Sequence, residues 1–213
     1  MIKVTLADDH EVVRAGIKML LEADPEIKVI SQAADGVQAY NLVQRDKPDV
    51  ILLDISMPPG QSGMVACEKI AGDFPDTKII ILTMFAEPEY LLFTLRGGAS
   101  GYVLKNSTSE ELHTAIRTVL DSRTYVHPTM ADLLAKHISN TGNASPSIQQ
   151  LSARELEILQ LIARGFTNKE IASKVYLSVK TVEAHRSKIY KKLNLNSRAD
   201  AVEYALEHKI LNI

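Results

Sequence analysis

The sequence has little cysteine, since Cys67 is the single cysteine among its 213 residues. One cysteine excludes a disulfide framework within the chain and a metal site built from cysteine ligands. The sequence also lacks internal repeats, a signal-peptide pattern and any apolar run long enough to span a bilayer. From these absences we expect a protein of the cytoplasm that does not associate with a membrane.

A large excess of one charge is missing too, because the formal net charge is only −2. The charges are nevertheless unevenly divided along the chain. Residues 1–148 contain 13 Lys and Arg against 19 Asp and Glu, whereas residues 149–213 contain 11 against 7. An acidic first part and a basic second part predict different partners, with nucleic acid a candidate for the second.

Short apolar runs alternate with helical patterns over residues 1–120. The predicted strands are 2–7, 27–33, 50–54, 78–83 and 101–104, and the predicted helices are 12–21, 36–45, 64–71, 89–95 and 109–120. Such alternation is typical of right-handed βαβ units on a parallel sheet. We therefore predict an α/β fold, doubly wound and flavodoxin-like, with strand order 2-1-3-4-5.

The alternation ends after residue 120, and the pattern becomes entirely helical from residue 151. Residues 139–147 are small, polar and turn-rich, as in a flexible linker. Four short helices are predicted at about 153–164, 168–175, 179–193 and 198–208. The predicted domains are residues 1–120, a linker at 121–148 with a possible short helix, and a small all-α domain at 149–213.

Polar residues stand where the predicted strands end. Asp8 and Asp9 follow the first strand, Asp54 ends the third, Thr83 closes the fourth and Lys105 follows the fifth. Carboxyl ends of neighbouring parallel strands meet at one edge of the sheet, where ligands bind. Crowded carboxylates repel one another unless a cation joins them, and Mg²⁺ prefers carboxylate and phosphate oxygens. The set predicts phosphoryl transfer to Asp54, although a lone strand-end Asp is more often a helix cap or a solvated turn residue.

Residues 2–120 resemble the receiver domain of two-component response regulators. The resemblance is carried by Asp8-Asp9, Asp54 followed by Met57-Pro58, Thr83, and Tyr102 three residues before Lys105. It implies that Asp54 accepts a phosphoryl group from a phosphohistidine of a sensor histidine kinase. It also implies that Mg²⁺ is bound by Asp8, Asp9, Asp54 and the carbonyl oxygen of Ser56. Thr83 and Tyr102 would form a switch pair, and Lys105 would supply the cation that pairs with the acyl phosphate.

The second and third predicted helices of the basic part have helix-turn-helix spacing, with a short turn at residues 176–178. The outer face of the third helix can enter a major groove, and residues near helix starts can contact phosphates. Glu183 would repel phosphates but can accept a hydrogen bond from a cytosine amino group. For an arbitrary helix pair, a solvated basic face is the commoner explanation. The predicted DNA contacts are Asn168, Lys169, Ser178, Lys180, Thr181, Glu183, Ala184, Ser187, Lys188 and Lys191.

This part resembles the LuxR-type DNA-binding domain, and a receiver followed by such a domain is similar to the NarL/FixJ class of response regulators. The matching residues include Leu151-Ser152-x-Arg154-Glu155, Asn168-Lys169-Glu170-Ile171-Ala172 and Ser178-x-Lys180-Thr181-Val182-x-x-His185. The resemblance implies a transcription regulator that binds double-stranded promoter DNA, acts with RNA polymerase and forms a homodimer on phosphorylation. The candidate dimer residues on the last helix are Val202, Ala205 and Leu206.

A narrower resemblance rests on Leu53-Asp54-x-Ser56-Met57-Pro58-Pro59-Gly60, on residues 81–85 and on residues 178–185. These segments are similar to the oxygen-responsive regulators of nitrate and nitrite respiration, including a loop that looks one residue longer than usual. A regulator of other genes is the alternative within the class. A Mg²⁺-dependent aspartyl phosphatase would need a second acid two residues after the nucleophile, where Ser56 stands. The third alternative is an adaptor whose basic domain binds protein.

Overall fold

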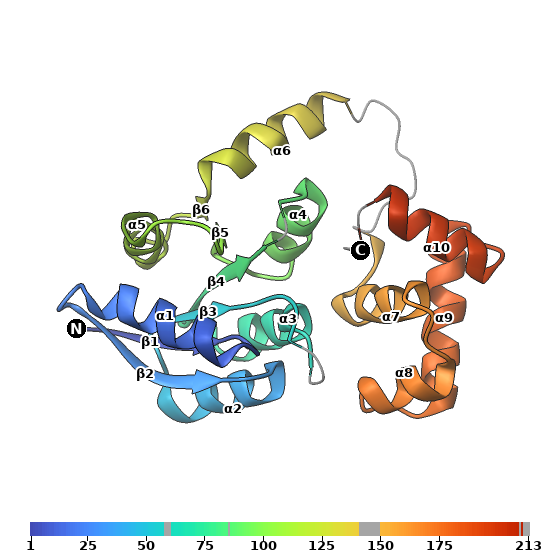
Figure 1. Cartoon of the computed structure of the whole chain (residues 1–213), viewed down its shortest axis with the longest axis horizontal. Coiled ribbons are helices and arrows are strands. Elements are labelled where there is room, and N and C mark those ends of the chain that lie inside the picture. Colours follow the sequence, from blue (N-terminus) through green and yellow to red (C-terminus); the bar gives the residue numbers. More distant parts are fainter. Residues whose placement is uncertain (58–60, 85, 141–149, 209, 211–213) are drawn as a thin grey trace. The chain divides into compact units, whose positions relative to one another are not determined.

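The chain folds into two units, Met1–Asn140 and Thr141–Ile213, each of which is described by itself. The computed structural model describes residues 1–57, 61–84, 86–140, 150–208 and 210 (Figure 1). Residues 58–60 of the loop after Asp54, residue 85 and most of the predicted flexible linker therefore lie outside the described residues.

A parallel sheet forms the centre of the first unit. Its order is β2-β1-β3-β4-β5-β6, so the predicted order 2-1-3-4-5 is confirmed and a short sixth strand is added beside β5. Every pair in the sheet is parallel. The strands are β1 (Ile2–Ala7), β2 (Ile27–Ala33), β3 (Val50–Leu53), β4 (Lys78–Thr83), β5 (Gly101–Leu104) and β6 (Tyr125–Val126).

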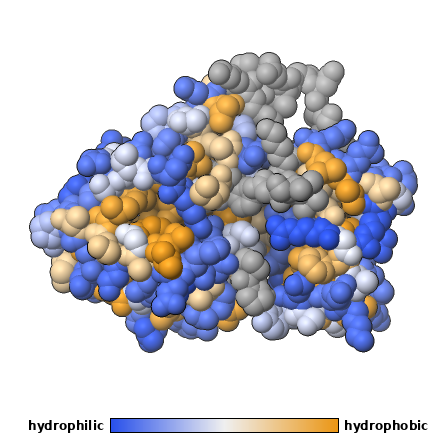
Figure 2. All heavy atoms as spheres, viewed as in Figure 1, coloured by the Kyte–Doolittle hydropathy of each residue, from blue (hydrophilic) through white to orange (hydrophobic). Residues whose placement is uncertain are grey.

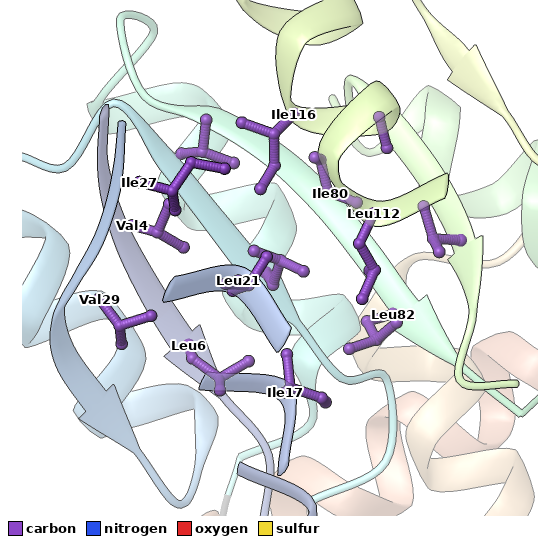
Figure 3. Close-up of a cluster of buried hydrophobic side chains, with 14 of the residues drawn as sticks. Val4, Leu6, Ile17, Leu21, Ile27, Val29, Ile80, Leu82, Leu112 and Ile116 are labelled. Atoms are coloured by element: carbon purple, nitrogen blue, oxygen red, sulfur yellow. The ribbon is translucent and has the colours of Figure 1, made fainter. Parts of the chain in front are cut away.

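Helices cover both faces of this sheet. They are α1 (Glu11–Glu22), α2 (Gly36–Asp46), α3 (Gly63–Asp73), α4 (Pro88–Arg96) and α5 (Ser109–Leu120), while α6 (Pro128–Asn140) follows β6 and contacts α4. On one face, Ile17 and Leu21 of α1 and Leu112 and Ile116 of α5 pack against the strands, as Figure 3 shows. Side chains alternate along a strand, so the buried Ile51 and Leu53 of β3 point to the opposite face. That alternation places a second apolar layer under α2 and α3, which pack against each other and contact β1, β2 and β4.

The segment expected to be a linker contains regular structure. β6 extends the sheet, and α6, which begins at Pro128, is the short helix that we expected in this segment. Met130 of α6 is fully buried, and α6 contacts α4. The first unit therefore continues past the predicted boundary at residue 120, because β5 leaves an edge that β6 can pair with.

The second unit consists of α7 (Ala153–Ala163), α8 (Asn168–Lys174), α9 (Val179–Leu193) and α10 (Arg198–Glu207), which confirms the four predicted helices. Capping boxes at Ser152 and Thr167 begin α7 and α8, and Ser178 caps α9. Apolar side chains at helical spacing close the core, namely Leu156, Leu159, Ile171, Val182, Ile189 and Leu193.

The visible surface of both units is a mixture of hydrophilic residues and smaller hydrophobic groups (Figure 2). Among the large apolar side chains that are exposed, Val12, Met19 and Leu20 lie on α1. Within the described residues, no helix combines the length and apolar character that a membrane crossing requires.

The start of α3 packs tightly on the backbone that follows β3. The Gly63 amide donates to the Ile55 carbonyl at 2.9 Å, and a Cβ on Gly63 would lie 1.7 Å from the carbonyl oxygen of Asp54. Only glycine fits this contact, so the position of Asp54 depends on Gly63.

We predict that Gly63→Ala lowers the free energy of unfolding by about 1–3 kcal/mol, because the backbone must shift to accept the methyl group. Urea unfolding measures this change. Gly72→Ala is the matched control on the same helix, since its Cβ would meet nothing within 4 Å. The control should gain roughly 0.5–1 kcal/mol from the higher helix propensity of alanine. Equal stabilities of the two variants would contradict the close approach.

Candidate functional site

The first site lies at the carboxyl edge of the sheet, where β1, β3, β4 and β5 end. The Asp54 amide donates to the Ala7 carbonyl at 2.9 Å, which aligns the ends of β3 and β1. The Lys105 amide donates to the Thr83 carbonyl at 2.8 Å, which does the same for β5 and β4. Asp8 and Thr83 are fully buried, and Asp54 is 4% exposed. Backbone pairing therefore brings together four residues that are distant in the sequence.

Lys105 joins two of the acids. Its Nζ lies 2.7 Å from Oδ2 of Asp8 and 2.7 Å from Oδ2 of Asp54. Burial raises the pKa of Asp54 to about 6, against the opposing effect of the Lys105 ammonium. Burial alone would lower the pKa of Lys105, but its hydrogen bonds to Asp54 and Asp8 outweigh that effect and raise it. Asp54 is therefore a buried carboxyl group whose negative charge is only partly compensated by the Lys105 ammonium.

Asp9 and His10 extend the acidic cluster beyond Asp8. The Nδ1 atom of His10 lies 2.8 Å from Oδ1 of Asp9 and 3.5 Å from Oδ1 of Asp8. The three residues form a group whose ligand atoms all lie within 4.8 Å of one another. Oδ1 of Asp9 is buried and accepts no hydrogen bond from the described residues. A buried carboxylate oxygen without a donor is a suitable ligand for a hard cation, so the cluster is consistent with a metal site.

Ser56 and Tyr102 complete the predicted set in the first unit. The Ser56 amide donates to Oδ1 of Asp54 at 3.4 Å, a long contact that keeps the residue beside the acid. Tyr102 is fully buried on β5. The residue that follows it on this strand is the register partner of Leu82 on β4. Burial raises the pKa of Tyr102, with Glu87 adding to the effect, so its hydroxyl stays protonated. The ring thus lies inside the unit.

Two neighbours of the acids were missed by sequence reasoning. Arg14 on α1 donates from Nη1 to the carbonyl of Asp8 at 2.5 Å. His10 occupies the N-cap position of α1 but makes no side-chain capping bond. Its sequence signal was available, because histidine stands where a capping Ser, Thr, Asp or Asn is usual.

The second site is the outer face of α9. Val182, Ile189 and Leu193 are buried on its inner face. Asn168 and Thr181 are half-buried, and the Ser178 hydroxyl lies 2.7 Å from that of Thr181. The remaining predicted DNA contacts are all exposed, and they are Lys169, Lys180, Glu183, Ala184, Ser187, Lys188 and Lys191.

An ion pair sets the position of α9 against α7. Lys192 Nζ lies 2.5 Å from Oε2 of Glu155, a residue that is 4% exposed. Burial raises the pKa of Glu155, but the hydrogen bonds from Lys192 and Ser152 outweigh this and lower it. The same carboxylate serves the capping box of α7. One buried acid therefore closes the start of α7 and holds the last turn of α9.

The candidate dimer residues on α10 differ in exposure. Leu206 is 45% exposed and Val202 is half-buried. Ala205 is fully buried in the core of the unit. Of these three residues, Leu206 and part of Val202 are available to a second chain.

Comparisons with known proteins agree with the division of the chain into two units. Residues 4–117 match the model of the response regulator receiver domain, and residues 149–205 match that of the LuxR family of bacterial regulatory proteins. The chain is 51% identical to the oxygen regulatory protein NreC of Staphylococcus carnosus over 99% of each chain. It is 53% identical to NreC of Staphylococcus aureus over 98% of this chain and 99% of the relative.

Solved structures are similar as well. RcsB of Salmonella enterica serovar Typhimurium, bound to a promoter in the presence of phosphomimetic BeF3-, gives a TM-score of 0.69 at 30% identity, covering 95% of this chain and 97% of that chain. ChrA, a response regulator of a heme-sensing two-component system, gives 0.55 at 32% identity, covering 99% and 98%. The narrower resemblance to oxygen-responsive regulators is confirmed by the two NreC relatives.

The buried carboxyl of Asp54 makes stability depend on pH. Its folded-state pKa of about 6 lies above the ordinary value of 3.8. The folded state therefore binds this proton more tightly, and the stability gained is present below pH 3.8 and lost as the pH rises through about 6.

We predict that Asp54→Asn raises the Tm at neutral pH in the presence of a chelator, because it removes a buried, incompletely compensated charge. The difference in Tm between the variant and the wild type should shrink as the pH falls through 6. Thermal unfolding over a pH series measures it. Asp49→Asn, an exposed acid just before β3, is the matched control and should show no such trend. A pH-independent difference for Asp54→Asn would contradict the shifted pKa.

Proposed function

The chain belongs to the two-component response regulators that join a receiver domain to a LuxR-type DNA-binding domain, and we propose that phosphorylation of Asp54 by a sensor histidine kinase controls its binding to DNA. The observation that carries the proposal is the ammonium of Lys105, 2.7 Å from both Asp8 and Asp54 at the buried edge of the sheet. As a response regulator, the chain accepts a phosphoryl group and is not an enzyme with turnover.

The proposed step transfers a phosphoryl group between two side chains. A carboxylate oxygen of Asp54 attacks the phosphorus of the kinase phosphohistidine. The P–O bond forms as the P–N bond breaks, and the imidazole leaves with the electron pair of that bond. The attack requires the ionised carboxylate, which Lys105 favours by lowering the pKa of Asp54 against the effect of burial.

We assign Mg²⁺ to Asp8, Asp9, Asp54 and the carbonyl oxygen of Ser56. The buried, undonated Oδ1 of Asp9 supports the assignment. When bound, the ion neutralises charge on the phosphoryl oxygens. Lys105 lies close enough to Asp54 to pair with a phosphoryl oxygen after transfer, and the buried hydroxyl of Thr83 stands at the end of the neighbouring strand β4.

The response is proposed to run from the acceptor to the second unit through Thr83 and Tyr102. A phosphoryl group attracts the Thr83 hydroxyl, and the buried Tyr102 ring occupies the space behind it. These changes shift the conformational population of the receiver toward a state that favours a homodimer, with Val202 and Leu206 as contacts on α10. Each dimer then binds promoter DNA through the outer faces of two α9 helices, and the DNA-bound dimer acts with RNA polymerase.

The proposed regulon comprises genes of nitrate and nitrite respiration under the control of oxygen. The support is the identity of about one half over the full length to proteins called oxygen regulatory protein NreC. A kinase that responds to oxygen is accordingly the proposed phosphodonor.

We predict that acetyl phosphate and Mg²⁺ phosphorylate the wild-type chain and Asp49→Asn but leave Asp54→Asn unmodified. Both variants remove one carboxylate near β3, so the comparison isolates the acceptor. Intact-mass spectrometry at neutral pH detects the acyl phosphate. Modification of Asp54→Asn to the wild-type level would overturn the assignment.

We predict that Lys191→Ala weakens binding of the phosphorylated chain to DNA upstream of its own gene and reduces the slope of log K against log salt by about 0.9, the effect of one phosphate contact. Fluorescence anisotropy over a salt series measures both quantities. Lys28→Ala removes the same charge from the first unit, where Lys28 pairs with Glu22, and should keep the wild-type slope. Equal slopes for the two variants would exclude Lys191 as a phosphate contact.

A further inference from the structure

The turn between α8 and α9 contains a bulky residue in a backbone conformation that favours glycine. Tyr176 has a φ of 54°, in the left-handed region. α8 ends at Lys174, and the Leu177 amide donates to the Ala172 carbonyl at 3.0 Å. This bond makes the turn a Schellman motif with Tyr176 just past the helix end. Glycine is usual at that position, because a Cβ there strains the backbone.

Smaller residues occupy the equivalent position after other helices of the chain. Gly98 follows α4 with a φ of 93°, Gly165 follows α7 with a φ of 97°, and Ser122 follows α5 with a φ of 59°. Each of these three turns is closed by the same type of backbone bond as the turn after α8. Among the described residues, Tyr176 is the only aromatic residue with a positive φ. A bulky residue in this conformation is costly, so a compensating interaction is expected.

Contacts within the chain do not compensate for this cost. Tyr176 is 73% exposed, whereas Tyr90 and Tyr102 are fully buried. Its hydroxyl and its ring make none of the hydrogen bonds or ring contacts found in the part of the chain that the structure describes. The fold therefore gains little from the aromatic side chain. An exposed ring that strains the backbone indicates a contact with another molecule.

The position of the turn favours DNA as that molecule. When a helix-turn-helix docks, its first helix crosses the DNA backbone and the start of its second helix enters the major groove. The turn that joins them lies over the backbone at the edge of the groove. Residues 174–180 contain Lys174 and Lys180 but no acid, so the charge around the turn attracts phosphates. A tyrosine there can donate its hydroxyl to a phosphate oxygen and pack its ring on the adjoining sugar.

We propose that Tyr176 is a contact to the DNA backbone, kept in a strained turn because its hydroxyl donates a neutral hydrogen bond to a phosphate. The proposal rests on the DNA binding of the proposed function and adds a residue to the contacts predicted from the sequence. Because tyrosine carries no charge, its contact releases no counterion. Its contribution to affinity is therefore independent of salt, unlike that of a lysine.

The test measures binding of the phosphorylated full chain to labelled DNA from upstream of its own gene, by fluorescence anisotropy over a salt series. Tyr176→Phe removes only the hydroxyl and leaves the backbone conformation as it is. Tyr176→Gly removes the ring as well and relieves the strain. Ser122→Gly is the matched control, an exposed residue at the equivalent position after α5 in the first unit. The Tm of each variant is measured alongside.

We expect Tyr176→Phe to weaken binding by about tenfold at every salt concentration, the effect of one hydrogen bond to a charged group. The slope of log K against log salt should stay at the wild-type value, whereas loss of a lysine contact reduces it by about 0.9. Tyr176→Gly should weaken binding at least as much, although its Tm rises by about 2–4 °C. Ser122→Gly should keep the wild-type affinity.

Three results would overturn the proposal without removing DNA binding. They are wild-type affinity in both Tyr176 variants, a smaller salt slope in Tyr176→Phe, and a lower Tm in Tyr176→Gly. The first would show that the turn makes no contact with DNA, the second that the contact is ionic, and the third that the ring stabilises the fold. Failure of the phosphorylated wild type to bind this DNA would remove both this proposal and the proposed function.

Discussion

The structure of the first unit depends on the pairing of one partly buried ammonium with two buried carboxylates. Lys105 contacts Asp8 and Asp54 at 2.7 Å each, and both acids are almost completely shielded from water. Burying a charge is costly unless it is paired, and two carboxylates with one ammonium are paired incompletely. The raised pKa of Asp54 expresses that imbalance. This uncompensated negative charge can be reduced by a cation bound near Asp9 or by a chemical change at Asp54.

The parallel sheet makes this pairing possible, and that part could be predicted from sequence. Each of Asp8, Asp54, Thr83 and Lys105 ends or follows an apolar run, and parallel strands bring such ends to one edge. The strand order and the helical second unit followed from alternation and periodicity in the same way. What pattern alone could not supply was the geometry between elements. The fit of Gly63 against the Asp54 carbonyl depends on an approach of backbones that no local signal encodes.

Other differences have similarly specific causes. β6 is two residues long, too short to carry a periodicity, and it exists because β5 offers an open edge. The burial of Ala205 depends on how α10 lies against α7, whereas a helical wheel shows only that Ala205 and Leu206 are neighbours. The role of Arg14 was hidden because its acceptor is a backbone carbonyl, so no charged partner in the sequence points to it.

The second unit also contains a buried acid paired with a lysine, but there the pKa of the acid is lowered instead of raised. The pKa of Glu155 is lowered, in contrast to that of Asp54, because its hydrogen bonds from Lys192 and from the Ser152 amide outweigh the effect of burial. The paired Glu155 stabilises the contact between α7 and α9, while Asp54, whose pKa is raised, remains responsive to ions and to phosphorylation. Phosphorylation replaces the single negative charge of the Asp54 carboxylate with about two negative charges on the phosphoryl oxygens. Lys105 must then be shared among more oxygens, so the edge of the sheet has to rearrange, whereas the frame that presents α9 to DNA can stay rigid.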